Sequence, residues 1–414
     1  MRGKADSDLV RRQNRLVVLE ALRFHGPLAR VDLGRRTGLS PATITSITTQ
    51  LIQDGVVVEQ RSLAAHLGST KRGRPTVLLG LKADACYIVA IKISIGMLEF
   101  ALADFTGQIL NRAKCSLATY EMSPTAFSER LTHETYRFIL LSRIDSTLIA
   151  EIRVAAQGLA DNRSGEIIWS PAFKARGIPV TLPLSHHFKI QCNLANDANM
   201  IAEGLIARKK LSLHKTTACV FMGYGIGMGL VIDGAVYHGS SGAAAEFGHM
   251  NHVPGGALCR CGRLGCLEAY ASDYGILRSA ENLPDNLAPP SHAVETEVMI
   301  ALEQAARNGD GEAVAAFQKA GRAIGFGLAR LIALINPDRI VLAGAGTRAV
   351  DLIAPAMHLA IEEGVIAELR QNVIIEILPM ETDMIISGTI DAALQNIDSK
   401  IFSNGPMLKM EHAL

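Results

Sequence analysis

Residues 246–268 read EFGHMNHVPGGALCRCGRLGCLE, and this stretch says most about the fold of the chain. It places His249 ten residues before Cys259 and then sets Cys261 and Cys266 along the same glycine-rich loop. One imidazole and three thiolates are the ligand set of a closed tetrahedral zinc site, which keeps no open position for a substrate. The pattern therefore predicts a structural zinc site with His249, Cys259, Cys261 and Cys266 as ligands.

The same loop has two other interpretations. Its thiols could be ordinary buried residues, which behave as small apolar side chains, or they could belong to a disulfide framework. A disulfide is disfavoured because the N-terminus has no cleavable secretion signal, so we expect the chain in the reducing cytoplasm. The other four of the seven cysteines are scattered without ligand spacing. Zinc is the interpretation that explains the spacing within the loop.

Two carboxylates, Glu246 and Glu268, stand at the ends of this stretch. A loop that closes around a metal draws both of them into the same small volume as His249. Such a loop, held in shape by the metal and bordered by acids, can present polar groups to a ligand. The stretch thus predicts a binding surface as well as a metal site.

The composition indicates a soluble chain of more than one domain. Its 414 residues exceed the length of one compact core, and no apolar stretch is long enough to span a bilayer, so we expect no membrane partner. The net charge of +1 is distributed unevenly along the chain. Residues 1–82 carry 14 Lys and Arg against 6 Asp and Glu, whereas residues 83–414 carry 27 against 34. A basic segment on an acidic body predicts a polyanionic partner for the first 82 residues alone.

Residues 1–82, which we call the head, have the pattern of a helix-turn-helix. Apolar positions at helical spacing predict a short helix over residues 30–37, ended by Gly38. Ser40 and Pro41 form an N-cap followed by proline at the first helical position, and they open a further helix over residues 42–53. Two helices joined by a glycine-containing turn are typical of DNA-binding motifs.

The rest of the head completes a winged helix-turn-helix. A first helix is expected over residues 11–24, and residues 56–59 and 76–79 would pair as a wing hairpin. Residues 71–75 read KRGRP, next to the second strand of the wing. Arginines in a glycine- and proline-rich extended segment suit insertion into a narrow minor groove.

These features assign two kinds of DNA contact. Short polar side chains at the start of the last helix are the expected base readers, namely Ser40, Thr43, Thr45 and Ser46. Basic side chains are expected on phosphate or in the minor groove, namely Arg30, Arg35, Arg36, Lys71, Arg72 and Arg74. The alternative is a small helical protein-binding module with a solvated basic loop. Helix spacing, capping and the basic wing independently favour double-stranded DNA.

Residues 83–414, which we call the body, alternate strands and helices with glycine-rich connections after strands. This pattern predicts an α/β fold with two lobes around a cleft. We expect one lobe to comprise about residues 83–195 together with the C-terminal helix. The other is expected to comprise about residues 196–395.

The body carries a set of short motifs that distinguish it from α/β proteins in general. In chain order they occupy residues 158–161, 170–171, 196–199, 223–227, 246–249, 259–266 and 336–342. Their order and spacing resemble the ROK family (repressors, open reading frames and kinases). The resemblance covers almost the whole chain once the winged head is included. It implies the two-lobed, actin-like sugar kinase fold, and it is strongest to the repressor branch with xylose-, N-acetylglucosamine- and glucose-responsive regulators.

The resemblance also implies roles for single residues. Asn196 and Asp197 would contact sugar hydroxyls, and Asp197 corresponds to the base that activates the acceptor hydroxyl in kinases. A carboxylate beside a carboxamide can accept a hydrogen bond from one hydroxyl and donate to the next. Glu246, His249 and Glu268 would be further sugar contacts, with His249 also a metal ligand. Taken alone, Asn196 and Asp197 could equally be an ordinary turn or helix cap.

The chain departs from the kinase pattern at the phosphate loop. Kinases of this family carry Asp-x-Gly-Gly-Thr-Lys on their first hairpin, and this chain has KISIGM at residues 92–97. Lys92 cannot hold Mg²⁺, and the side chain of Ile95 keeps phosphate away from the backbone. Tyr224 stands where a small hydroxyl residue is usual, and Ala172 stands where many kinases have a sugar-binding Asn. Phosphoryl transfer is therefore not expected, and Asp197 would be a vestigial base.

The sequence thus predicts a cytoplasmic, sugar-responsive transcription factor. It would act as a homodimer or homotetramer on a DNA operator and most simply as a repressor of carbohydrate uptake or catabolism genes. A sugar or sugar derivative between the lobes would control it. One alternative is a sugar kinase with a DNA-binding appendage. Another keeps DNA binding but replaces the sugar with a protein partner.

Overall fold

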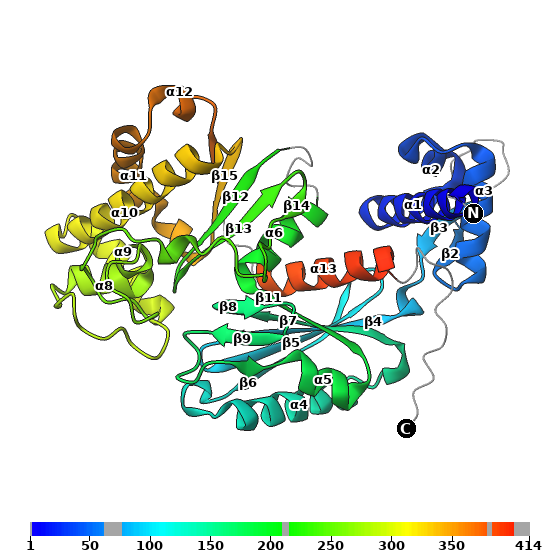
Figure 1. The fold of residues 1–414 in the computed structure, drawn as a ribbon, viewed down its shortest axis with the longest axis horizontal. Coiled ribbons are helices and arrows are strands. Elements are labelled where there is room, and N and C mark those ends of the chain that lie inside the picture. The colour runs from blue at the N-terminus through cyan, green and yellow to red at the C-terminus, as the bar shows by residue number, and fades with distance from the viewer. Residues whose placement is uncertain (1, 62–76, 209–214, 379–382, 401–414) are drawn as a thin grey trace.

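The computed structural model describes residues 2–61, 77–208, 215–378 and 383–400. It contains an N-terminal winged helix-turn-helix and two α/β lobes, each built on a five-stranded sheet. Helix α13 (Met384–Lys400) runs between the lobes and reaches the head (Figure 1). This architecture confirms the predicted fold class. Among the described helices, none combines the length and the hydropathy of a bilayer span.

Capping residues set the helices of the head. Helix α2 ends at Gly38, whose φ of 72° is left-handed and whose N–H donates to the carbonyl of Gly34. Ser40 caps the next helix by accepting a hydrogen bond from the Thr43 N–H at 3.2 Å. The predicted boundaries of these two helices are confirmed to within a residue, whereas the first helix begins well before residue 11. The three helices are α1 (Arg2–His25), α2 (Arg30–Thr37) and α3 (Pro41–Gln53).

The wing strands are β2 (Val57–Arg61) and β3 (Val77–Leu81), and they pair antiparallel with Glu59 opposite Leu79. A two-residue strand, β1 (Leu28–Ala29), joins the free edge of β3. The wing hairpin therefore forms as predicted. The basic residues expected at its tip, Lys71, Arg72 and Arg74, lie outside the described residues.

The first lobe is a mixed sheet in the order β11-β7-β4-β5-β6. Helices α4 and α5 lie along one side of it and α13 packs on β4 and β7 at the other (Figure 1). A small sheet, β10-β9-β8, extends from it toward the second lobe. The elements are β4 (Tyr87–Ser94), β5 (Met97–Asp104), β6 (Ile109–Ser116), α4 (Pro124–Leu141), β7 (Ile149–Ala156), β8 (Leu159–Asp161), β9 (Glu166–Trp169), β10 (Ile178–Pro179), α5 (Thr181–Phe188) and β11 (Gln191–Asn196).

The second lobe repeats the plan with the sheet order β14-β13-β12-β15-β16. Its largest helix, α10, is alanine- and glycine-rich, and it packs closely against α11 in the core of the lobe. The elements are α6 (Asp197–Ala207), β12 (Thr217–Met222), β13 (Ile226–Ile232), β14 (Ala235–Val236), α7 (Glu268–Ala271), α8 (Asp273–Ala280), α9 (Thr296–Arg307), α10 (Gly311–Ile335), β15 (Arg339–Ala343), α11 (Val350–Gly364), α12 (Ala367–Arg370) and β16 (Ile374–Ile377).

Helix α13 joins all three parts of the molecule. It crosses α6 at backbone contact, since a Cβ on Gly204 would lie 2.9 Å from the Cα of Gly388. Its apolar face, including Leu394 and Ile397, belongs to the same buried cluster as Leu19 and Leu22 of α1. The hydrophobic core of the head is therefore continuous with that of the first lobe. This continuity could not be predicted from sequence, because it depends on residues at opposite ends of the chain.

Candidate ligand cavity and metal centre

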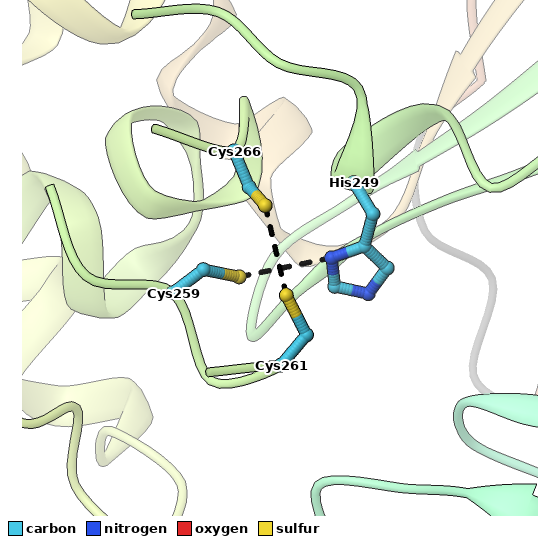
Figure 2. A group of neighbouring side chains, drawn as sticks. All are labelled: His249, Cys259, Cys261 and Cys266. Atoms are coloured by element: carbon cyan, nitrogen blue, oxygen red, sulfur yellow. Dashed lines mark hydrogen bonds between the residues drawn. The ribbon is translucent and has the colours of Figure 1, made fainter. Parts of the chain in front are cut away.

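The four predicted metal ligands converge on one point. The side chains of His249, Cys259, Cys261 and Cys266 meet in a loop of the second lobe (Figure 2). Their ligand atoms all lie within 4.8 Å of one another. Cys259 Sγ is 3.7 Å from His249 Nδ1, and the sulfurs of Cys261 and Cys266 are 3.6 Å apart.

Local turns bring these ligands together. The N–H of Gly262 donates to the carbonyl of Cys259, and the N–H of Cys259 donates to that of Arg263, so the first two thiols share one tight turn. Gly265 has a φ of 81°, and a Cβ there would lie 1.8 Å from the carbonyl oxygen of Val253. Only glycine fits this position, because no side chain could pass that backbone. The glycines between the cysteines thus fold the loop onto itself.

The donor set and its spacing fit a tetrahedral metal. Bonds of about 2.3 Å to sulfur and about 2.0 Å to nitrogen place tetrahedral ligand atoms roughly 3.5–3.8 Å apart. The two separations of 3.6 and 3.7 Å agree with these edges. Hydrogen bonds from Cys259 and Cys266 lower the pKa of Cys261 below its usual value, which favours the thiolate form that binds a metal. Thus the residues present could hold zinc through His249 Nδ1.

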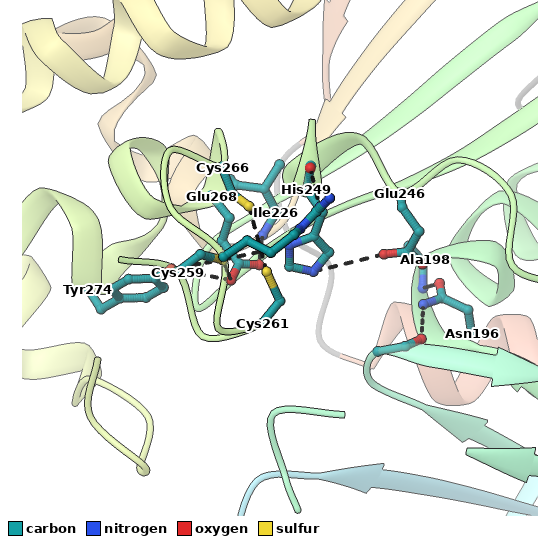
Figure 3. A network of polar contacts seen from close by, with 12 residues as sticks. Asn196, Ala198, Ile226, Glu246, His249, Cys259, Cys261, Cys266, Glu268 and Tyr274 are labelled. Atoms are coloured by element: carbon teal, nitrogen blue, oxygen red, sulfur yellow. Dashed lines mark hydrogen bonds and ion pairs between the residues drawn. The ribbon is translucent and has the colours of Figure 1, made fainter. Parts of the chain in front are cut away.

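The two carboxylates make different contacts with this centre. Glu268 is buried, and one of its oxygens accepts from Cys259 Sγ at 3.7 Å and from the Tyr274 hydroxyl at 3.4 Å. Its other oxygen accepts from the N–H of Ile226 at 3.2 Å, which ties the loop to β13. Glu246 lies between the His249 ring and the start of α6 (Figure 3), 3.9 Å from Nε2 of that ring.

A cavity of about 570 Å³ opens beside the metal centre, between the lobes. All five residues predicted as ligand contacts line it, namely Asn196, Asp197, Glu246, His249 and Glu268. Sequence reasoning missed Gln157 and Trp169, which line the same wall. Trp169 is the only tryptophan of the chain, and its position next to Ser170 and Pro171 was the available signal.

Asn196 has a structural task in addition to its place in the cavity wall. Its side-chain oxygen accepts from the N–H groups of Ala198 and Asn199, so it is the N-cap of α6. Its amide nitrogen donates to the carbonyl of Gly158 at 2.8 Å. The helix cap, one of the two alternatives that the sequence left for Asn196, is therefore formed, and the same residue lines the cavity. A ligand that meets Asn196 meets the first turn of α6.

Asp197 is the first residue of α6 and lies in the interlobe cavity. Desolvation raises its pKa to about 6, although a hydrogen bond from the Ala198 N–H and the charge of Lys92 oppose the shift. Glu246 adds a smaller upward contribution as a nearby negative charge. The carboxyl group thus changes protonation near neutral pH.

The first hairpin of the body places Lys92 in an ion pair. Its Nζ lies 2.7 Å from Glu99, and Lys114 lies 2.9 Å from the other oxygen of that carboxylate. Desolvation acts to raise the pKa of Glu99, but the hydrogen bonds from both lysines prevail and hold it below its usual value. Lys92, which stands where the kinase pattern described above has an acid, is thus a cation paired with Glu99.

The second glycine-rich turn is filled by aromatic and cationic groups. The Arg260 guanidinium lies over the ring of Tyr224 at 3.8 Å and over that of Tyr274 at 4.2 Å. It also donates to the Tyr224 carbonyl at 2.9 Å. Neither Ala172 nor Phe173, the residues after Ser170 and Pro171, lines the first cavity; both are buried in the first lobe.

The predicted base readers lie at the start of α3. Ser40, Thr45 and Ser46 are exposed and Thr43 is half-buried, while Ile44 and Ile47 face the core of the head. The predicted phosphate-contacting arginines make protein contacts of their own. Arg30 reaches Thr48 and Glu59, Arg35 pairs with Asp32, and Arg36 contacts His25.

Comparison with known proteins agrees with this architecture. The Escherichia coli repressor Mlc is 26% identical over 373 residues, which cover 89% of this chain and 90% of that protein. The xylose repressor of Caldicellulosiruptor bescii is 23% identical over 397 residues, covering 94% and 97%.

Solved structures show the same fold. A ROK family transcriptional regulator described as a homologue of E. coli Mlc has a TM-score of 0.75 and 24% identity, covering 95% of this chain and 99% of that one. A ROK family glucokinase from Streptomyces griseus, solved with glucose and AMPPNP, has a TM-score of 0.59 and 24% identity, covering 74% and 98%. The ROK family profile itself matches residues 88–393, well over half of the chain. The protein therefore belongs to the ROK family.

Proposed function

We propose that the protein is a transcriptional regulator that binds an operator in double-stranded DNA through its head and a sugar or sugar derivative through the interlobe cavity. The observation that carries this proposal is one chain that joins an exposed helix-turn-helix to a cavity walled by Asn196, Asp197, Glu246 and Glu268. Carboxylates and a carboxamide match the donors and acceptors of sugar hydroxyls. The names of the related repressors support repression of carbohydrate uptake or catabolism genes.

We propose zinc as the metal of the His249 loop, with a structural role. Four protein ligands leave no position for a reacting molecule, so the ion would supply rigidity. It would fix His249 directly, and through Cys266 it would fix the short segment that carries the buried Glu268 two residues later; both of these side chains line the cavity. Metal binding and sugar binding would then be coupled indirectly.

We also propose residues 1–82 as the DNA-binding unit and residues 83–414 as the sensing unit. A homodimer or homotetramer would place two heads on the two half-sites of an operator. Helix α13 offers the route between ligand and DNA. Helix α6 starts in the cavity at Asp197 and crosses α13 at Gly388, and α13 holds α1 of the head. A ligand that favours one position of α6 would shift the position of the head.

The protein should therefore retard DNA from the region upstream of its own coding sequence, and an effector sugar should change that retardation. The measurement is a gel-shift titration with metal-loaded protein at moderate salt, repeated with pentoses, hexoses, amino sugars and polyols. Absence of any sequence-specific complex would overturn the proposal. If a partner protein released the DNA and no sugar did, the proposal of a sugar effector would be wrong, whereas the proposal of operator binding would stand.

Two variants of the head provide matched controls. Ser46→Ala should alter base preference, at a cost of about 1–3 kcal/mol on the specific site, because its exposed hydroxyl faces outward from α3. Arg35→Ala should weaken binding equally on specific and scrambled DNA and reduce the salt dependence by about one ion. Equal losses on both DNAs for Ser46→Ala would reject its role as a base reader.

Sugar kinase activity is the second candidate, and the fold shared with the glucokinase favours it. The Lys92–Glu99 ion pair disfavours it, because an ammonium group has no lone pair to offer Mg²⁺ and the charge of this one is already neutralised by a carboxylate. Turnover of ATP with any hexose, abolished by Asp197→Asn, would establish the kinase instead.

Sugar affinity should rise with pH through about 6, by about tenfold between pH 5 and 7, because the ionised form of Asp197 accepts hydrogen bonds from hydroxyls. The sign follows from the raised pKa: the protonated acid dominates below that value and the carboxylate above it. Asp197→Asn should bind weakly and lose this dependence. The variant should fold, because its amide removes the cost of burying a charge. Isothermal titration at several pH values tests this, and a pH profile unchanged by the substitution would contradict it.

A further inference from the structure

A second cavity adjoins the first and has the opposite charge. It has a volume of about 870 Å³ and lies between the β9–β10 connection of the first lobe and the metal loop of the second. The two cavities share Trp169 and Pro171 as a common wall, and the Trp169 ring stands edge-on to His249 with centroids 5.2 Å apart. A molecule bound in the first cavity can therefore extend past Trp169 into the second.

The side chains of the second cavity differ in kind from those of the first. The first cavity has three carboxylates, those of Asp197, Glu246 and Glu268. The second has three cations and no carboxylate among its described lining residues, the cations being Lys174, Arg176 and Arg260. Trp169 and Tyr120 add aromatic surface to it. Aromatic faces suit the apolar face of a sugar ring, and the cations suit an anionic substituent.

The surroundings of Arg260 support anion binding in the second cavity. Its Nε and Nη2 atoms are buried and have no hydrogen-bond partner among the described residues. The guanidinium is stacked between Tyr224 and Tyr274, which keeps it desolvated and in one orientation. Buried donors without acceptors are costly, and an anion that supplies acceptors offsets that cost. Lys174 and Arg176 are exposed at the rim, where they can close on the same group.

We propose that the second cavity is a subsite for a carboxylated sugar residue, so that the effector is an acidic oligosaccharide. This inference rests on the proposed function, because one neutral ring would occupy the first cavity. The carboxylate of the neighbouring residue would meet Lys174, Arg176 and Arg260. The charge would then sit one residue away from the ring held by Asp197, so a monosaccharide acid would gain nothing from the second cavity.

Matched ligands test the proposal on the full-length, metal-loaded protein. Isothermal titration would compare cellobiose with cellobiouronic acid and cellobionate, and maltose with maltobionate, together with glucose and glucuronate. At least one acidic disaccharide should bind about tenfold more tightly than its neutral counterpart, with the advantage reduced by salt. Glucuronate should gain nothing over glucose.

A double variant locates the effect. Lys174→Ala with Arg176→Ala removes two of the three cations and should strongly reduce the preference for the acid, while the affinity for glucose, which fills the first cavity alone, should not change. Arg11→Ala with Arg12→Ala removes the same charge from the exposed surface of α1 and should leave the preference intact.

The outcomes separate this inference from the proposed function. If neutral sugars bind and no acidic disaccharide binds better, the second subsite is wrong and sugar sensing stands. If the double variant keeps the preference, the anion lies elsewhere and the assignment of this cavity is wrong. If no saccharide binds at all, both proposals fail.

Discussion

Replacing Cys261 by Ser should lower the thermal unfolding midpoint by roughly 10 °C. The substitution removes one of the four ligands that converge in the loop, and loss of a structural metal is among the few single changes that cost about 4 kcal/mol. For a unit of roughly 150–250 residues, the size of one lobe, each kcal/mol corresponds to about 2–4 °C. Affinity for the effector should fall as well, because Glu268 lies two residues after Cys266 in the loop that the metal would hold, and it lines the cavity. Differential scanning fluorimetry and elemental analysis measure both effects.

Cys115→Ser is the matched control for this experiment. Cys115 is half-buried on β6 and is not one of the residues that converge at the metal centre. The same sulfur-to-oxygen change there should leave the metal content intact and the midpoint within a few degrees of the parent. Metal content unchanged in Cys261→Ser would refute the ligand assignment. A chelator that has no effect on the midpoint of the parent protein would do the same.

Replacing Asp398 by Ala should destabilise the protein by about 3–5 kcal/mol, because it leaves the charge of Arg23 buried without its partner. Arg23 of α1 makes two hydrogen bonds to the Asp398 carboxylate of α13, at 2.7 and 2.8 Å. The exposed fractions of the two side chains are only 17% and 3%. Arg23 also donates to the carbonyl of Phe105 and lies over its ring. Urea unfolding measures the loss, and limited proteolysis shows whether the head is released.

The pair should matter more for the position of the head than for net stability. Desolvation raises the pKa of Asp398 above its usual value, and this outweighs the attraction of Arg23. Ionising Asp398 therefore costs more free energy in the folded protein than in water. Arg23→Met combined with Asp398→Leu should be within about 1 kcal/mol of the parent in stability, since apolar replacement of a buried pair is often neutral. The same double variant should bind DNA with a weakened response to the effector.

Two results would count against this account. A loss of less than about 1 kcal/mol in Asp398→Ala would mean that Arg23 finds water or another partner. A normal effector response in the double variant would mean that the signal does not pass through this contact. Glu203→Gln, a change on α6 outside the ion pair, controls for a general effect of charge removal beside α13.

Local signals explain why several elements could be predicted closely. Helix α2 and the start of α3 are fixed by Gly38 and Ser40, whose effects reach only a few residues along the chain. The metal centre is almost as local, because its glycines fold one loop and bring the three cysteines together. The polar residues of the cavity were found through their family motifs. Their individual contacts, such as the capping of α6 by Asn196, could not be read from spacing.

The sequence by itself determined the cluster of one histidine and three cysteines, the winged head and the family fold, because each is encoded by residues close in sequence or by motifs in a recognisable order. Only the tertiary structure decided how the parts are connected. It paired Arg23 with Asp398 across 375 positions, and it set Trp169 between an acidic and a basic cavity. Those contacts arise from packing α13 against the head and one lobe against the other. No local pattern records them, since burial and charge contrast appear only when distant segments share one surface.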